Sequence, residues 1–277
     1  MSEQSKRKNG ASATGKNATA EQSVLRELGV HGQRWAEVFD GFFSDANAAG
    51  PLLDAVEKAI EFGKPDVLAD LGGGTGFLLA ELLQRGLLTV RLVDVDLSEK
   101  QLSVCANGGI VKLQSPLNQV TRRQLLAGEE RLLLMSRSML HYFGRDGIDP
   151  LLKHLRMQLH PGEFFVHQSA CFARQGDADL MNLLYERMET GKWFFTRDEL
   201  AARLQRAGFA VRAASPAPPL QMSSADLRER YGLGPEEKVA IGREIVEKFG
   251  CGQKIFTREG DEFRATLCYS IFTCEAV

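Results

Sequence analysis

The sequence predicts an α/β protein whose mostly parallel sheet carries helices on both faces. Short apolar runs alternate with segments of helical periodicity from residue 66 to 214. A glycine-rich turn at 72–76 joins the first apolar run to the first of these helices. Acidic residues stand at the ends of the first two runs, as Asp70 and as Asp94 with Asp96. Because ligands of open α/β sheets bind beyond the carboxyl ends of the strands, these features predict a ligand site there.

Composition limits the classes of function. The chain has 277 residues, of which 44% are hydrophobic and 25% charged, enough for one large α/β domain with extensions. Its formal net charge of −2 lacks the basic excess of a dedicated nucleic-acid binder, so no nucleic acid is expected as a partner. Five cysteines without a C-x-x-C pair predict neither a metal site nor a disulfide framework.

The sequence also lacks targeting features. No apolar run approaches the roughly 20 residues that cross a bilayer, and the N-terminus has no apolar signal-peptide core. We therefore expect a cytoplasmic protein without a membrane partner.

The first 65 residues divide into two predicted parts. Residues 1–20 are small and polar, which predicts a disordered tail. Residues 21–65 predict a helical N-terminal prefix, because apolar side chains recur at helical spacing from Val24 to Phe43 and from Pro51 to Phe62. Such a prefix either lies across the mouth of the site or only covers the sheet.

The glycine turn follows a predicted buried strand at 66–71. Its glycines permit positive φ angles and let a ligand approach the main chain without meeting a Cβ atom. A dinucleotide fingerprint starting at Gly72 would need its third glycine at position 77, where Phe77 stands. An ordinary tight connection between strand and helix is the alternative. The glycines are Gly72, Gly73, Gly74 and Gly76.

The second predicted strand, 89–95, ends at two acids. Ser98 is a predicted N-cap of the next helix, with Gln101 in the capping-box position. An acid at this strand end can accept both hydroxyls of a ribose. Asp96, about 20 residues beyond the glycine turn, is the preferred candidate, and Asp94 is the alternative.

The remaining pattern completes the sheet. Thr196 with Glu199 predicts a capped helix over 196–207, which leads into a sixth strand. An insertion at about 215–255 separates that strand from a last, antiparallel strand. The insertion is predicted to begin with a Pro-rich loop, Ser215 to Leu220, and to continue as one or two helices between Ser223 and Phe249. A lid and a homodimer contact are both possible roles for it. The other predicted strands are 109–114, 131–136, 163–169, 209–213 and 263–274, with a further helix at 148–159.

Four segments resemble class I S-adenosylmethionine (SAM) dependent methyltransferases. The run from Asp70 to Phe77 resembles the D/E-x-G-x-G-x-G motif of the family, and Val95-Asp96-Leu97-Ser98 resembles its V-D-x-S segment. Ser136 to Phe143 resembles the S-x-x-L-H-x-F segment after strand four, and Leu159-His160-Pro161-Gly162 its L-x-P-G turn. The resemblance implies a seven-stranded Rossmann-like methyltransferase sheet, with SAM as cofactor and S-adenosylhomocysteine (SAH) as product. Strand three departs from the family, because Gln114 or Asn118 stands where an acid usually contacts adenine.

The resemblance also implies roles for individual residues. The carboxylate of Asp70 suits the amino-acid portion of SAM, and His141 after strand four is the candidate base, since an ordinary histidine pKa near 6.5 suits proton removal. A structural role for His141 is the alternative. Expected acceptor contacts are Arg137, Tyr142, His167 and Trp193. Expected cofactor contacts are Asp70, Gly72, Gly73, Gly74, Gly76, Asp96, Leu97 and Ser138.

The predicted function is methyl transfer from SAM to an oxygen, nitrogen or carbon atom of a small molecule. Two alternatives remain. A macromolecular acceptor, protein or RNA, is disfavoured because no N/D-P-P-Y/F segment follows strand four. A noncatalytic protein that binds SAM or another nucleoside would keep the same cofactor residues.

Overall fold

The computed structural model describes residues 40–277, except 87–88, 106–107 and 252. The predicted tail and the prefix helix from Val24 to residue 39 lie outside these residues. The described part forms a nine-stranded sheet in the order β3-β2-β1-β4-β5-β9-β7, with β6 beside β5 and β8 beside β9. The strands are β1 Val67–Leu71, β2 Arg91–Asp96, β3 Ile110–Gln114, β4 Leu132–Arg137, β5 Phe164–Phe172, β6 Phe195–Thr196, β7 Phe209–Ser223, β8 Phe256–Glu259 and β9 Glu262–Ala276.

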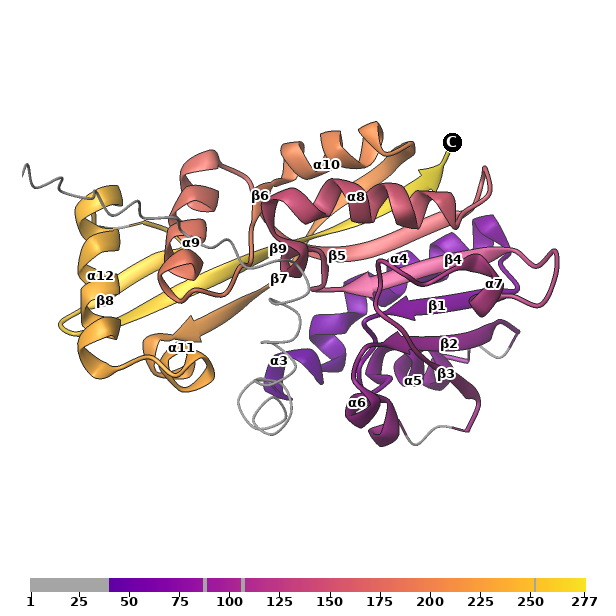
Figure 1. Cartoon of the computed structure of the whole chain (residues 1–277), viewed down its shortest axis with the longest axis horizontal. Helices are drawn as coiled ribbons and strands as arrows, with labels where there is room; N and C mark the ends of the chain where they lie inside the picture. The colour runs from indigo at the N-terminus through magenta and orange to yellow at the C-terminus, as the bar shows by residue number, and fades with distance from the viewer. Residues whose placement is uncertain (1–39, 87–88, 106–107, 252) are drawn as a thin grey trace, which may run out of the picture.

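The predicted parallel sheet with an antiparallel last strand is confirmed. Strands β1 to β5 pair in parallel, whereas β9 pairs antiparallel to both β5 and β7. The register places Asp70 opposite Asp94 on one side and opposite Met135 on the other. The carboxyl ends of the parallel strands point towards α3, α9 and α11 (Figure 1).

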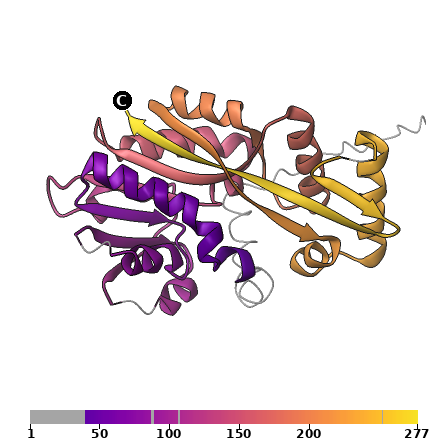
Figure 2. The same cartoon turned by 180° about the vertical axis from the view of Figure 1, so that it is seen from behind.

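Helices cover both faces of the sheet, as the alternating pattern predicts. In Figure 1, α8 and α10 lie in front of the sheet, and Figure 2 shows α4 across the opposite face. The helices are α3 Asp40–Phe43, α4 Ala46–Gly63, α5 Phe77–Gln84, α6 Glu99–Val104, α7 Arg122–Leu125, α8 Gly144–Met157, α9 Gln175–Arg187, α10 Arg197–Arg206, α11 Ser224–Tyr231 and α12 Pro235–Phe249, with a short 3-10 helix, η1, at Leu140–Phe143.

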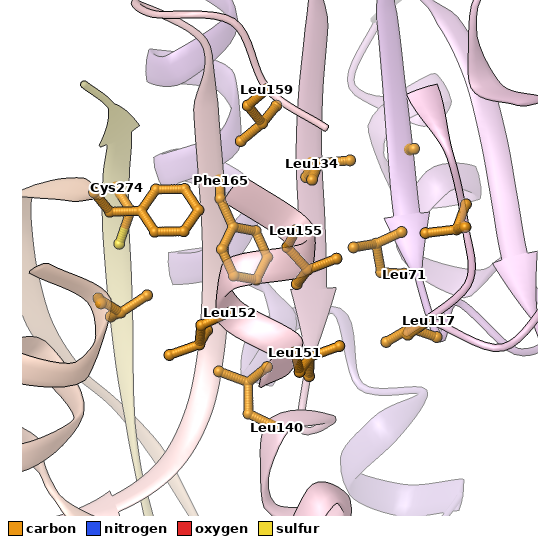
Figure 3. Close-up of a cluster of buried hydrophobic side chains, with 14 of the residues drawn as sticks. Leu71, Leu117, Leu134, Leu140, Leu151, Leu152, Leu155, Leu159, Phe165 and Cys274 are labelled. Atoms are coloured by element: carbon orange, nitrogen blue, oxygen red, sulfur yellow. The ribbon is translucent and has the colours of Figure 1, made fainter. Parts of the chain in front are cut away.

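Each face of the sheet has its own apolar core. In Figure 3, leucines of α8 pack over Leu134 of β4 and Phe165 of β5. On the other face, Leu52, Leu53 and Val56 of α4 pack against the sheet around Leu68. Alternation along each strand sends neighbouring side chains to opposite cores, so the two cores together fix the strand register.

The predicted caps are mostly confirmed. Thr196 and Glu199 form the expected capping box of α10, and Ser98 Oγ accepts a hydrogen bond from the Gln101 amide at the start of α6. The amide of Ser98 itself donates to Asp96 Oδ1 at 2.8 Å. In a complete capping box, the Gln101 side chain would accept the hydrogen bond of the Ser98 amide. Here Asp96 accepts that hydrogen bond instead.

The predicted Pro-rich loop is wrong, because Ser215 to Leu220 belong to β7 and pair with β9. Proline is tolerated there since β7 is the last strand in the order, and Pro218 and Pro219 fall where the register shifts between Ala217 and Leu220. The predicted helices of the insertion are confirmed as α11 and α12. They pack with α9, β8 and the distal halves of β7 and β9 around a third apolar core (Figure 1).

Glu163 forms a hydrogen-bonded network at the amino-terminal ends of β4 and β5. Its buried carboxylate accepts two hydrogen bonds from Arg122, at 2.6 and 2.9 Å, and one each from the amides of Leu132 and His160. Burial would raise the pKa of Glu163, but these donors bring it below its ordinary value of 4.5. This pair ties α7 to the start of both β4 and β5.

Replacing Glu163 with Gln should lower the free energy of unfolding at neutral pH by about 3 kcal/mol, because Arg122 would lose the charged half of a buried pair. The depressed pKa means that the stabilisation is present above 4.5 and is lost as pH falls through the folded-state pKa. Urea unfolding at neutral and acidic pH measures both effects. Glu244→Gln, at the exposed pair with Arg187, is the control and should change stability far less. An equal loss at both pH values would contradict this account.

Candidate functional site

Polar side chains of adjacent strands meet at the carboxyl edge of the sheet. Asp70 and Asp94 are opposite each other on β1 and β2. Met135 faces Asp70, and Arg137, two residues further along β4, is opposite Gln168 of β5. Because alternate residues share a face, Asp70, Asp94, Arg137 and Gln168 lie on the same face of the sheet.

The glycine turn between β1 and α5 adopts the backbone that its sequence predicts. Gly72, Gly74 and Gly76 have φ angles of +78°, +65° and +75°, which favour glycine. Gly73 is required for a different reason, since a Cβ atom there would lie 2.4 Å from Asp94 Oδ1 and 2.9 Å from Asp70 Oδ2. The turn thus packs directly on two carboxyl groups.

Asp70 and Asp94 are both fully buried. Neither oxygen of either carboxyl has a hydrogen-bond partner among the described residues. Burial raises the pKa of Asp70 well above its ordinary value; the charges of Asp94 and Asp96 raise it further, and Arg137 opposes them. Buried polar groups are normally satisfied, so this pair marks a place where a positively charged or hydrogen-bonding ligand would complete the structure.

Asp96 differs from Asp94 in both contacts and exposure. It lies half-buried at the end of β2, and its oxygens accept hydrogen bonds from the amides of Gly74, at 3.1 Å, and Ser98, at 2.8 Å. Burial raises the pKa of Asp96, and the amides of Ser98, Gly74 and Leu97 oppose that rise. Asp94 is fully buried beneath the turn, and Asp96 is the more exposed of the two acids at the end of β2. Leu97, also half-buried, receives a hydrogen bond on its carbonyl from the Gln114 side chain, so Gln114 lies beside the same strand end.

The segment after β4 contacts the glycine turn. Met139 fills the space over Gly72, where an added Cβ would come within 2.6 Å of its sulfur. Ser138 has a φ angle of +60° and shares a 2.9 Å hydrogen bond with the Tyr269 hydroxyl. The ring of His141 is buried, with centroids of Tyr142 and Phe194 at 4.4 and 5.3 Å. Expected cofactor and acceptor residues therefore occupy one continuous segment.

Arg137 is buried at the same edge. Its guanidinium donates to the carbonyls of Phe42 and Phe43, both at 3.1 Å, and lies 5.2 Å from each of their ring centroids. Burial lowers the pKa of Arg137, whereas the nearby Tyr269 and Asp70 raise it. Arg137 therefore binds the end of α3 to the sheet.

One expected acceptor residue, His167, lies apart from this group. His167 points to the opposite face of β5, where its ring stacks on Phe165 and Phe272 and shares a hydrogen bond with Ser169. Burial lowers the pKa of His167 to about 3, as expected for a core residue. The half-buried Trp193 ring lies 5.3 Å from the Arg145 guanidinium. Alternation along β5 brings Gln168 to the site in place of His167.

Sequence reasoning did not identify Lys192, Tyr231 and Tyr269. Lys192 Nζ donates to the Tyr231 hydroxyl at 2.8 Å and lies 4.4 Å from the Tyr142 ring centroid. Tyr269 comes from β9 and Tyr231 from the end of α11, so both reach the site through the late part of the chain. The β-rich composition of 263–274 predicted the strand, but no local pattern indicated which of its side chains faces the site.

Two further findings concern ligands and membranes. Among the residues that the structure describes, no group of three His, Cys, Asp or Glu side chains is arranged to hold a metal ion. No helix within the same residues has the length and apolarity needed to span a bilayer.

The fold and the site define a class. Five parallel strands, an antiparallel strand inserted between β5 and β7, a glycine turn after β1 and acids at the ends of β1 and β2 define a class I SAM-dependent methyltransferase fold. The family comparison agrees: residues 44–214 match the model described as a methyltransferase domain. The chain belongs to this methyltransferase family. The match includes α4.

Solved structures share the fold at low sequence identity. A methyltransferase candidate from Bacillus halodurans C-125 is 17% identical, with a TM-score of 0.61 over 82% of this chain and 98% of its own. A Burkholderia thailandensis 1,6-didemethyltoxoflavin N1-methyltransferase, bound to that compound and SAH, is 17% identical, with a TM-score of 0.54 over 98% of this chain and 93% of its own. The mitomycin 7-O-methyltransferase MmcR is 14% identical, with a TM-score of 0.52 over 95% and 62%. No curated protein matches the chain in sequence.

The buried acid of β2 makes a testable contribution to pH dependence. Burial and the charge of Asp96 raise the pKa of Asp94 from 3.8 to about 7, against an opposing effect of Lys112. The folded protein then holds this proton more tightly than the unfolded chain, so stability should fall as pH rises from about 4 to about 7. Asp94→Asn should reduce this slope and raise stability above neutral pH, measured by urea unfolding across that range. Asp179→Asn, on the exposed side of α9, should leave the slope unchanged. A slope in Asp94→Asn equal to that of the wild type would refute the assignment.

Proposed function

We propose that this protein transfers a methyl group from SAM to an oxygen, nitrogen or carbon atom of a small-molecule acceptor. One observation carries the proposal: the Asp70 carboxyl is buried against a glycine turn, and neither of its oxygens has a partner among the described residues. The amino-acid portion of SAM carries an ammonium group, which would satisfy this carboxyl. Family membership supplies the reaction class.

The other cofactor residues fit a nucleoside at the same edge. The half-buried Asp96 carboxylate would accept the ribose hydroxyls, and its bonds to Gly74 and Ser98 hold it at the turn. Gly72, Gly73 and Gly76 leave the main chain bare where a side chain would collide with Met139, Asp94 or Cys105. Gln114, whose side chain donates to the Leu97 carbonyl, would border the adenine of SAM. The segment that begins at Ser138 would border the amino-acid end of SAM.

SAM, when bound, supplies a methyl group that its positively charged sulfur already activates. The chain then has to orient the acceptor, exclude water and, where the acceptor is protonated, remove its proton. His141 is our candidate for the proton-accepting group. Its ring lies against those of Phe194 and Tyr142, and its carbonyl accepts a hydrogen bond from the Trp193 amide. Arg137 and Tyr142 border the same segment and would contact the acceptor.

The late insertion would complete the acceptor side. We propose that residues of about 215–255, including α11 and α12, form a cover over the carboxyl edge, because Tyr231 at the end of α11 reaches Lys192 next to the His141 segment. The toxoflavin and mitomycin methyltransferases named above act on small molecules, which favours a small acceptor here too. A cytoplasmic location, the absence of nucleic-acid partners and a homodimer contact through the insertion stay predictions.

Calorimetry with SAM and SAH tests the cofactor assignment. The wild type should bind both ligands at micromolar concentrations or tighter, and failure to bind either would refute the proposal. A methyl-transfer screen with labelled SAM over phenols, amines and carboxylates then tests turnover. Binding without transfer to any acceptor would favour the noncatalytic alternative, and labelling of protein or RNA would favour the macromolecular one.

Asp70→Asn should weaken binding of both SAM and SAH at least about tenfold, because the amide keeps the shape of the side chain but loses its charge for the ammonium. The cofactor-free variant should be no less stable than the wild type, since burial already disfavours the Asp70 carboxylate. Calorimetry and thermal unfolding measure the two effects separately. Asp179→Asn is the matched control. Unchanged affinity in Asp70→Asn would exclude Asp70 from the cofactor site.

His141→Asn should lower kcat about a hundredfold or more with an identified protonated acceptor, because general base catalysis contributes on that order. The Kd for SAM should stay near the wild-type value, which separates loss of a base from loss of the fold. His160→Asn, at an exposed position, is the control. An unchanged kcat would assign His141 a structural role.

A further inference from the structure

Asp70 and Asp94 are neighbours in space as well as in register. They stand opposite each other on β1 and β2, and adjacent strands lie about 4.8 Å apart. A Cβ atom on Gly73 would lie 2.4 Å from Asp94 Oδ1 and 2.9 Å from Asp70 Oδ2, so the two carboxyl groups converge on one point beneath the turn. We call these two residues the aspartate pair. Because the terminal torsion of an aspartate rotates easily, a proton can lie between the two groups.

The aspartate pair receives no hydrogen bond from the described part of the chain. Both residues are 0% exposed, and no oxygen of either carboxyl has a partner there. Asp96 differs, because its oxygens accept from the amides of Gly74 and Ser98. An ionised carboxyl group that is buried without donors is unfavourable, and two such groups side by side also repel each other. A proton on one carboxyl group removes the repulsion and supplies a donor for the other.

On the β3 side, one lysine acts on the aspartate pair. Lys112 stands opposite Asp94 in the register of β2 and β3, and its side chain is exposed. Its charge lowers the pKa of Asp94, but burial and the charge of Asp96 outweigh it and raise that pKa to about 7. An exposed cation therefore does not replace the missing donor.

On the other sides, the aspartate pair meets Arg137 and Cys105. Arg137 of β4 lowers the pKa of Asp70, although burial and the neighbouring acids keep it well above its ordinary value. The guanidinium of Arg137 already donates to two carbonyls at the end of α3. Cys105 follows α6, and a Cβ atom on Gly76 would lie 2.6 Å from its Sγ and 3.3 Å from Asp94 Oδ2. The surroundings thus favour one negative charge on the aspartate pair over two.

A bound cofactor would change the protonation of the aspartate pair. In the proposed function, the ammonium group of SAM or SAH lies against Asp70. A positive charge beside an acid favours its ionised form, so the aspartate pair would hold a proton less tightly in the complex. Binding and protonation are thermodynamically linked, so a ligand that displaces a proton binds more tightly as pH rises.

We propose that Asp70 and Asp94 share one proton in the cofactor-free protein, and that the ammonium group of SAM or SAH displaces this proton to solvent. This inference rests on the proposed methyltransferase function and adds a regulation of the same site, because loading with the cofactor then depends on pH. Asp94 acts on the cofactor through Asp70 and is a positioning residue. The proton is the only group that is transferred.

Calorimetry with SAH measures the displaced proton directly. Titrations at about pH 6.5 in phosphate and in imidazole, two buffers with different ionisation enthalpies, give the number of protons released. We expect more than about half a proton per SAH, and a Kd that falls by up to about tenfold per pH unit and levels off above about 7. The ligand control is 5′-methylthioadenosine, which lacks the amino-acid portion and should displace no proton from the aspartate pair. No release by SAH, or equal release by both ligands, would overturn the proposal.

Variants assign the proton to the aspartate pair. Asp94→Asn keeps the shape of the side chain and a donor for Asp70, so proton release should fall close to zero and the Kd for SAH should become independent of pH. A proton that His141 contributes would persist in this variant. Lys112→Met, at an exposed position, should move the pH dependence of the Kd to higher pH, because the lysine charge lowers the pKa of Asp94. Asp179→Asn is the matched control and should keep the wild-type release.

Thermal unfolding checks that each variant folds. A release in folded Asp94→Asn equal to that of the wild type would assign the proton to another group and overturn the proposal. If Asp94→Asn does not fold, Lys112→Met decides, since an unchanged pH dependence in that variant would equally contradict the shared proton.

The same titrations separate this inference from the proposed function. SAH binding that releases no proton and does not vary with pH would overturn the shared proton and leave the cofactor assignment intact. If SAH binds at no pH, the proposed function fails, and the displacement of the proton fails with it.

Discussion

The close packing of buried carboxyl groups against the glycine turn is the constraint on which the rest of the site depends. Gly73 has no space for a Cβ atom because Asp70 and Asp94 lie directly beneath it. Two buried acids without partners among the described residues are unfavourable for the protein alone, which raises the pKa of both. Buried acids with perturbed pKa values of this kind are common at functional sites.

The two ends of the sheet differ in how their buried acids are stabilised. At its opposite end, Glu163 is fully satisfied by Arg122 and two backbone amides, so the same sheet carries one acid in a stable environment and others in an unfavourable one. The apolar cores on the two faces hold the strand register between these ends. The third core, around α9, α11 and α12, belongs to the long β7–β9 pair and positions the elements that face the carboxyl edge.

The site thus combines two kinds of charge in neighbouring regions. The cofactor edge is rich in carboxyl groups, whereas the segment beyond β4 is bordered by Arg137 and Lys192, both buried against aromatic rings. The carboxyl groups would attract a cationic cofactor to their part of this edge.

The sequence by itself determined the features that depend on local geometry. Apolar periodicity located every strand except the short β6 and β8, and most helices. Positive φ required glycine at positions 72, 74 and 76, and the caps at Ser98 and Thr196 followed from neighbouring residues. The tertiary structure alone decided the features that depend on contacts between distant segments. Pairing with β9 made a strand of the Pro-rich segment, alternation on β5 placed Gln168 and not His167 at the site, and chain reversal through α11 brought Tyr231 to Lys192. No local pattern encodes such contacts, because they arise only when separate elements pack on the same edge of the sheet.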